Sequence, residues 1–261
     1  MLRKCFVLVL ASVGASVVPF STVAQGRDIS FSYGAEYSTG KYGTSQETDI
    51  WYFPFAFEYD ADRFTVSLTA PLMMVNGPGS IVAGGDSRGL PSGRAPGTSD
   101  TEVGVGDIQL RGSVNLALED NNRPRIDLTG KIKFGTADRD KNLGTGEDDF
   151  AVQVDAERTY AGAGLFGALG YKLLGDPPGV NYKNPFYVRL GAALRVSDTT
   201  SVGAAFDAQE EVLSGTPAQR DLTLFLSSRA DPRTKITGYV LKGLRDGSPD
   251  WGVGIMVKLQ Q

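Results

Sequence analysis

Histidine is absent from the 261-residue sequence, and cysteine occurs only once, as Cys5. Without histidine the chain cannot build a serine–histidine hydrolase, a histidine proton relay or a histidine-ligated metal site. The net charge of −4 gives no strongly basic face of the kind that binds nucleic acid. These absences argue against an enzyme and a nucleic-acid partner, and no cofactor is expected.

Long apolar runs are also scarce, and the one that is present lies at the N-terminus. Arg3 and Lys4 precede the apolar segment from Cys5 to Val18, and small residues then lead to Ala24. This order is typical of a signal peptide cleaved after Ala24, so we predict a signal peptide over 1–24 and one domain over 25–261. The alternative, a membrane-anchoring helix, needs about 20 apolar residues. A mature chain from Gln25 contains no cysteine, so it has neither a disulfide nor thiol chemistry.

The remaining sequence alternates between apolar and polar residues. From Asp107 to Leu118 every second side chain is apolar, and the residues between are mostly polar or charged. The segment from Phe186 to Val196 repeats this pattern, with Leu190 on the apolar face and Arg189 on the other. A period of two predicts strands, and one apolar and one polar face are typical of a wall between lipid and water. Glycine, at 33 residues without a fixed period, argues against long helices.

Twelve segments fit this pattern, most of them about 10 to 13 residues long. A tilted strand that crosses a bilayer needs about 9 to 11 residues, whereas strands of soluble proteins are mostly five or six residues long. We therefore predict an all-β fold, a closed transmembrane antiparallel up-and-down β-barrel of about 12 strands. The predicted strands are 29–38, 49–59, 64–73, 105–118, 125–136, 149–159, 162–174, 185–196, 200–211, 220–230, 235–244 and 251–259.

Short and long connections alternate along the chain. The short ones are 60–62, 119–124, 160–161, 197–199 and 231–233. The long ones are 39–48, 74–104, 137–148, 175–184, 212–219 and 245–250. Outer-membrane barrels have short periplasmic turns and long extracellular loops, and an even strand number lets the last strand pair with the first. The alternation thus favours a barrel in the cell outer membrane over a soluble sandwich.

The longest predicted loop, 74–104, has about 31 residues and is rich in Gly, Ser and Pro. Structureless loops of this length are uncommon inside compact domains. As an extracellular excursion it has two possible forms, a mobile loop or one that folds inward and narrows the pore. The composition favours the mobile form.

Three stretches carry a family resemblance: Gly104–Leu110 (GVGDIQL), Gly144–Phe150 (GTGEDDF) and Leu244–Ile255 (LRDGSPDWGVGI). Together they resemble the outer-membrane family named for the MetA pathway of phenol degradation, whose members are described as transporters. The resemblance extends from about Val103 to the C-terminus, and the last motif is the most specific. It implies a barrel that admits small compounds, often hydrophobic or aromatic. The family supplies no established binding residues.

Other motifs have simpler explanations than a cofactor or metal site. Gly162–Gly167 matches the glycine spacing of a dinucleotide fingerprint, but it opens a predicted strand where that fingerprint requires a helix. Glu147, Asp148 and Asp149 could hold a hard cation, yet their spacing fits no EF-hand and a solvated loop is the favoured explanation. The alternating aromatics at 51–59 fit a lipid-facing strand with aromatic girdles.

The inward face of the predicted barrel is charged with both signs. Isolated charges are costly in a narrow barrel, so we expect acids and bases on neighbouring strands to pair. Twelve strands enclose more space than eight, which side chains fill, and less than the 16 of open porins. The residues predicted to face the lumen are Glu58, Asp107, Arg111, Lys131, Lys133, Asp155, Glu157, Arg189, Arg195, Asp207 and Arg229.

A channel or transporter for small solutes, hydrophobic or aromatic ones among them, is the favoured function. Its expected partners are outer-membrane lipids and a small-molecule solute. A structural or adhesive surface barrel with a closed lumen is the alternative, because balanced charges can close the lumen. An outer-membrane enzyme is a remote third. The solute and the oligomeric state are left open by the sequence.

Overall fold

A computed structural model describes residues 6–8, 20–22, 28–95, 97–120, 123–160 and 162–261. Near the N-terminus, β1 (Phe6–Leu8) and β2 (Phe20–Thr22) pair antiparallel. The predicted cleavage site at Ala24 lies outside the described residues. Among the residues that the structure describes, no helix is long and apolar enough to cross a membrane.

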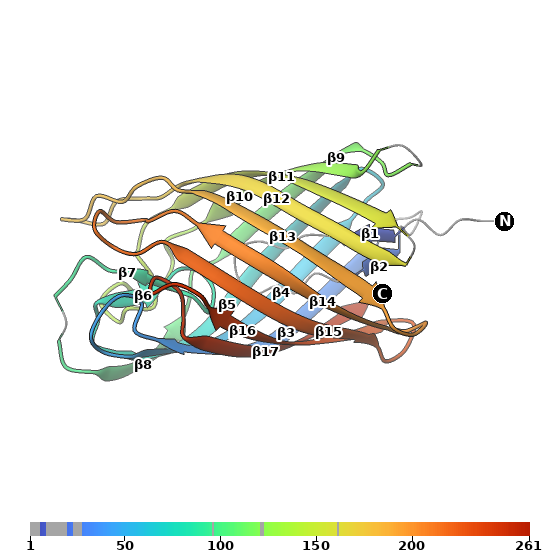
Figure 1. The fold of residues 1–261 in the computed structure, drawn as a ribbon. Coiled ribbons are helices and arrows are strands. Elements are labelled where there is room, and N and C mark those ends of the chain that lie inside the picture. The colour runs from blue at the N-terminus through green and yellow to red at the C-terminus, as the bar shows by residue number, and fades with distance from the viewer. Residues whose placement is uncertain (1–5, 9–19, 23–27, 96, 121–122, 161) are drawn as a thin grey trace.

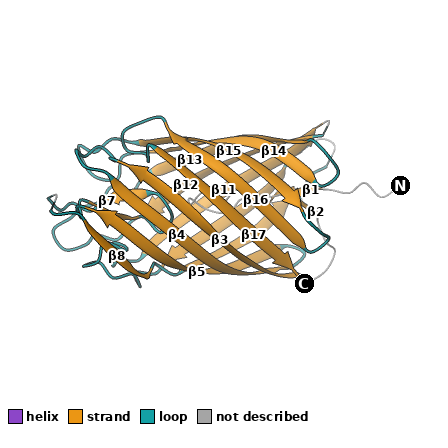
Figure 2. Cartoon of the chain, turned by 90° about the horizontal axis from the view of Figure 1, so that it is seen from below, coloured by secondary structure: helices purple, strands orange, loops and turns teal. Residues whose placement is uncertain are grey.

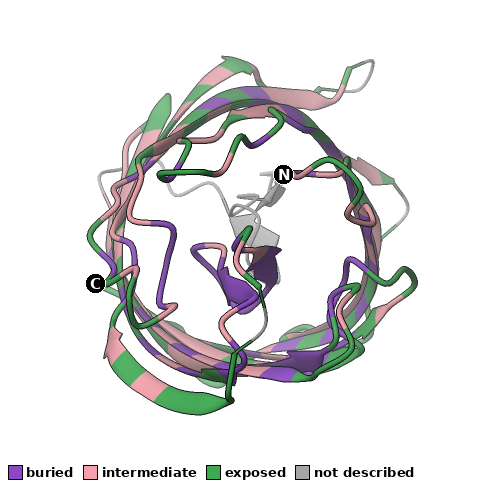
Figure 3. Ribbon diagram, turned by 90° about the vertical axis from the view of Figure 1, so that its left-hand side faces the viewer, coloured by how far each residue is buried: buried purple, intermediate pink, exposed green. Residues whose placement is uncertain are grey.

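The rest of the described chain forms a closed antiparallel barrel of 12 wall strands, as predicted. Each strand pairs with the next along the chain, and the last, β17, pairs with the first, β3, so no edge of the ring is left open (Figure 3). One wall strand is broken into β8 and β9, both of which pair with β5. The strands are β3 (Asp28–Gly40), β4 (Thr48–Asp60), β5 (Phe64–Gly77), β8 (Asp100–Val105), β9 (Gln109–Ala117), β10 (Arg125–Lys133), β11 (Asp149–Tyr160), β12 (Ala163–Leu173), β13 (Phe186–Arg195), β14 (Thr200–Gln209), β15 (Gln219–Arg229), β16 (Thr234–Gly243) and β17 (Trp251–Gln260).

The long connections lie together at one end of the barrel and the short turns at the other (Figures 1 and 2). The C-terminus lies at the short-turn end. Alternate residues along each strand face opposite sides of the wall. On β13, Leu190 and Leu194 are more than half exposed, whereas Tyr187 and Arg189 are buried. The outer surface is therefore apolar, and polar side chains are turned inward.

The broken strand begins earlier than the sequence predicts, at Asp100 where Val105 was predicted, and it is interrupted at 106–108. Asp107 is fully buried at the break. It accepts a hydrogen bond from the Ala137 backbone nitrogen (2.9 Å) and forms an ion pair with Lys133 (2.8 Å). A Cβ on Gly106 would lie 2.5 Å from the sulfur of Met73, so this close approach requires glycine. Contacts of this kind do not follow the two-residue period of a strand, so the sequence pattern does not predict the break.

Inward-facing aromatic rings lie directly opposite glycines on the neighbouring strand. At Gly170 an added Cβ would lie 2.2 Å from Cζ of Tyr187, so the ring occupies the place of a side chain. The rings therefore lie along the wall, where they take less of the lumen than rings that project across it. The four pairs are Phe166–Gly191, Tyr187–Gly170, Phe225–Gly203 and Tyr239–Gly254.

Candidate functional site

The connection between β5 and β8 folds into the barrel. The expectation that this loop is mobile is not met, because residues 80–92 form a compact hairpin with strands β6 (Ile81–Ala83) and β7 (Gly89–Pro91). A view down the barrel axis from the long-loop end shows this buried hairpin inside the ring (Figure 3). The inward-folded form, which the sequence left as the alternative, is the one observed.

Apolar packing holds the hairpin from two sides. Side chains on a strand alternate between faces, and β6 buries both of its faces. Ile81 and Ala83 pack into one cluster with wall residues such as Met73. Val82 packs on the other side in a cluster with Tyr182. The hairpin is thus wedged between the wall and the neighbouring long loops.

A buried arginine at the tip of the hairpin makes an ionic contact with the opposite wall. Arg88 is 3% exposed, and its Nε donates to Asp221 on β15 at 2.8 Å. Its guanidinium also lies 3.6 Å from Asp207 on β14 and 3.8 Å from Asp86 in the hairpin. Three carboxylates around one buried cation make this the most strongly charged contact of the hairpin.

The pKa shifts of the hairpin follow from this geometry. Burial acts to lower the pKa of Arg88, but Asp221, Asp207 and Asp86 together outweigh it and the pKa is raised. Burial raises the pKa of Asp86, with Arg88 acting in the opposite direction. Arg88 consequently stays charged at any physiological pH, and the ionic contact depends on its carboxylate partners.

Hydrogen bonds to the hairpin backbone add to this contact. Gln219 of β15 donates to the Gly89 carbonyl at 3.0 Å, and the Tyr182 hydroxyl donates to the Pro91 carbonyl at 2.6 Å. Burial raises the pKa of Tyr182 to about 12, so its hydroxyl keeps the proton that it donates. Wall strands and neighbouring long loops therefore fix the hairpin in place.

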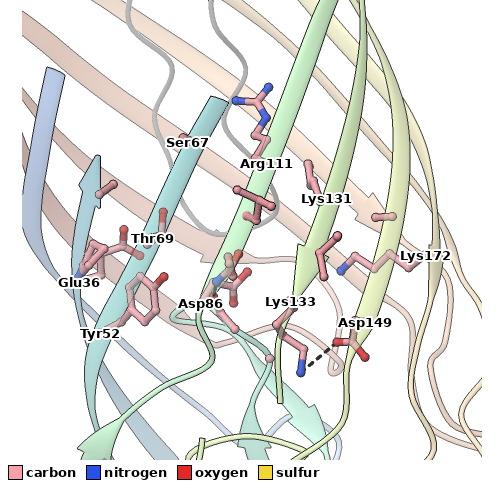
Figure 4. A pocket seen from close by; sticks show the side chains of 18 of the residues that line it. Glu36, Tyr52, Ser67, Thr69, Asp86, Arg111, Lys131, Lys133, Asp149 and Lys172 are labelled. Carbon is pink, nitrogen blue, oxygen red and sulfur yellow. Dashed lines mark hydrogen bonds and ion pairs between the residues drawn. The ribbon is translucent and has the colours of Figure 1, made fainter. Parts of the chain in front are cut away.

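Beside the hairpin the lumen contains a cavity of about 210 Å³. Asp86 of the hairpin faces it, as do Arg111, Lys131 and Lys172 of three wall strands (Figure 4). This is smaller than the roughly 300–1,000 Å³ of typical sites for drug-sized ligands. The cavity could therefore hold a small molecule but not a long chain.

Most of the charges predicted to face the lumen lie inside the barrel, and several form the expected cross-strand pairs. Each ion pair joins an acid of one wall strand, or of the break at Asp107, to a base of another strand, so the charges stabilise the wall as well as lining it. The pairs are Lys133–Asp107 (2.8 Å), Lys133–Asp149 (3.2 Å), Arg189–Asp207 (2.6 Å) and Lys258–Glu58 (2.5 Å).

The other predicted residues have different surroundings. Asp155 is buried and accepts a hydrogen bond from Thr129. Glu157, two residues further along β11 and on the same face, is also buried. Arg195 and Arg229 lie at the ends of β13 and β15 and are exposed at the short-turn rim. They are not part of the cavity. Arg111 and Lys131 line it.

Sequence reasoning missed several residues of the lumen. Lys172, Asp221 and Lys258 follow the inward parity of their strands, so the alternation could have found them. Arg88 carries no such signal, because the loop has no period and its partner Asp221 is 133 residues away.

The glycine-rich stretch and the acidic cluster of the sequence analysis both have structural roles. The glycine-rich stretch of 163–167 belongs to strand β12, not to a helix. Asp148 accepts a hydrogen bond from the Gly135 backbone, and Asp149 pairs with Lys133. Among the described residues no group of three or more acids, histidines or cysteines is placed to hold a metal ion.

Solved structures of outer-membrane proteins align with this chain over nearly their whole length, among them the following two. An outer membrane channel from Pseudomonas putida F1 aligns with a TM-score of 0.69 at 14% identity, covering 92% of this chain and 97% of the channel. The KdgM porin aligns with a TM-score of 0.50 at 10% identity, covering 88% of this chain and 98% of the porin. No family model and no curated relative matches the sequence.

The chain shares the fold of an outer-membrane channel. Because the sequence identities are low, this likeness concerns the barrel and not the residues inside it. The lumen of this outer-membrane channel fold must therefore be interpreted from its own hairpin, its ion pairs and its cavity.

Proposed function

We propose that this protein is an outer-membrane channel that admits small solutes past an inward-folded hairpin. The observation that carries the proposal is the cavity of about 210 Å³ beside that hairpin, enclosed by a closed wall and lined by charged side chains. A barrel that served only as a rigid surface element would have no need to keep such a space. Membership of the phenol-degradation family remains a prediction from the three sequence motifs.

Purified protein in a planar lipid bilayer provides the test. We expect small, stable conductance steps, because the hairpin leaves a narrow path through a polar lumen. The matching assay is swelling of liposomes that contain the protein in solutions of small solutes. Silence in both assays would refute the channel and favour the structural barrel, for which the dense ion pairs of the wall are the supporting observation.

The orientation in the membrane is part of the proposal, with the long loops outside the cell and the short turns in the periplasm. We predict that a protease-sensitive tag inserted after Thr98 is cut on intact cells. Both Thr98 and Asp198 are exposed, but they lie at opposite ends of the barrel. A tag after Asp198 should resist the same protease until the outer membrane is broken. Cutting at Asp198 but not at Thr98 would reverse the assignment.

The partners that follow are lipids around the exposed apolar wall and the solute inside. The localisation that follows is the outer membrane, reached through the predicted signal peptide of residues 1–24. Analysis of the mature N-terminus tests that segment, and Gln25 is the residue expected there.

A further inference from the structure

Three cations of the cavity lie in one continuous row across the wall. The strand register places Arg111 of β9 directly opposite Lys131 of β10, and Ala151 of β11 lies between Lys131 and Lys172 of β12. We call Arg111, Lys131 and Lys172 the cationic row (Figure 4). Like charges at directly opposite positions destabilise a sheet. A fold that keeps them there needs a compensating interaction.

Among the described residues no close ion pair joins this row to a carboxylate of the wall. Lys131 donates to the side-chain oxygen of Gln153 at 2.7 Å, and Lys172 donates to that of Gln209 at 2.6 Å. Arg111 is buried, and its Nε has no hydrogen-bond partner among the described residues. Neutral amides do not balance the positive charge of three side chains.

Two wall acids lie near the row. The two carboxylates with the largest electrostatic effect on Arg111 are Asp155 and Glu58. Glu58 pairs with Lys258 at 2.5 Å. Of the two, Asp155, which accepts a hydrogen bond from the neutral Thr129 at 2.8 Å, is therefore left to offset the charge of the three cations. Over the whole cavity, six basic side chains face four acidic ones. The site therefore has an excess of positive charge.

The cavity also offers apolar surface beside the row. The ring of Tyr187 lies between the two lysines, with each Nζ 5.5 Å from the ring centre. Leu90 of the hairpin and Pro54 and Met256 of other wall strands also line the cavity. A ligand that fits both surfaces has a negative head and a small apolar body.

We propose that the cationic row binds the carboxylate of a small organic acid with an apolar body. Ionised carboxylates only accept hydrogen bonds, whereas the ammonium groups and the guanidinium here carry more donors than the wall uses. A bound carboxylate would also relieve the repulsion between Arg111 and Lys131. This inference rests on the proposed channel function and names the class of solute for it.

The test measures binding and conduction separately, with benzoate as the probe and benzamide as its uncharged counterpart. Calorimetry on the purified barrel should show benzoate binding, and benzamide should bind at least about tenfold more weakly because it lacks the charge. Lys131→Gln and Lys172→Gln should each weaken benzoate binding by about tenfold. Lys242→Gln, which removes a lysine on the outer face of β16 and outside the cavity, should leave binding unchanged.

Stability separates a binding role from a structural one. Lys131 lies directly opposite Arg111, so Lys131→Gln removes a repulsion between like charges and should not lower the thermal stability of the barrel. Equal binding of benzoate and benzamide, unchanged affinity in both lysine variants, or tighter binding of inorganic phosphate than of benzoate would each overturn the organic-acid site. If any of these outcomes is found in a barrel that conducts, the channel proposal is retained and the organic-acid site is rejected. If benzoate binds as expected in a barrel that never conducts, the site stands and the channel fails.

Discussion

Arg88→Gln is expected to release the hairpin from the opposite wall. The substitution leaves Asp221, Asp207 and Asp86 without their common cation, and breaking a buried ion pair from one side costs roughly 3 to 5 kcal/mol. Because each 1.4 kcal/mol is a factor of ten, the displaced form should become about one hundredfold more populated or more.

A thiol at position 87 reports this change. Ser87 is buried beside Arg88, and the predicted mature chain has no other cysteine, so Ser87→Cys introduces a single reactive group. Its rate of reaction with a maleimide should rise in proportion to the displaced population when Arg88→Gln is added. Arg94→Gln is the matched control, because Arg94 is partly exposed and lies 3.9 Å from the exposed Asp140. Equal rates in both backgrounds would show that Arg88 does not hold the hairpin.

Leu190→Arg should largely prevent insertion of the barrel. Leu190 lies on the outer face of β13, in the middle of the strand, and is 57% exposed. A charge near the midplane of the lipid face costs roughly 2 to 4 kcal/mol. Arg189→Leu, at the adjacent position, should impair insertion less, because Asp207 keeps a cationic partner in Arg88, which lies 3.6 Å away.

Folding into lipid vesicles, followed by the shift in gel mobility between folded and heated protein, measures this difference. Leu190→Ala controls for the loss of the leucine itself and should insert nearly normally. If Arg189→Leu impairs insertion as much as Leu190→Arg or more, the two faces of β13 have been assigned the wrong way round.

The wall of the barrel could be predicted from the sequence because its physics is repetitive. Each strand must present apolar residues to one side and polar residues to the other, so the alternation around Leu190 and Arg189 fixes both the strand and its faces. Connection lengths then determine the strand count and the two ends. The break at Asp107 was not predictable, because it depends on contacts with Ala137 and Lys133 from another strand and loop.

The interior was only partly predictable. Strand parity identifies which charges face inward, and Arg189 and Asp207, both predicted to face inward from neighbouring strands, form an ion pair in the structure. Strand parity does not identify which charged side chains lack an ion-pair partner, because that depends on the register of the strands and on the conformations of the side chains. The contact of Arg88 in the hairpin with Asp221 crosses the lumen, and neither composition nor period encodes such a distant contact.

The central claim is that the hairpin sets the width of a conducting lumen, and shortening the hairpin tests it most directly. The backbone nitrogen of Ser92 donates to the Ser80 carbonyl at 2.8 Å, so these residues form the base of the hairpin. Replacing residues 81–91 by Asn-Gly, a pair suited to a tight turn, should leave the wall intact. Single-channel recordings of both proteins should then show small steps for the natural chain and steps several times larger for the shortened one. Equal step sizes, or no conductance from either folded barrel, would contradict the account.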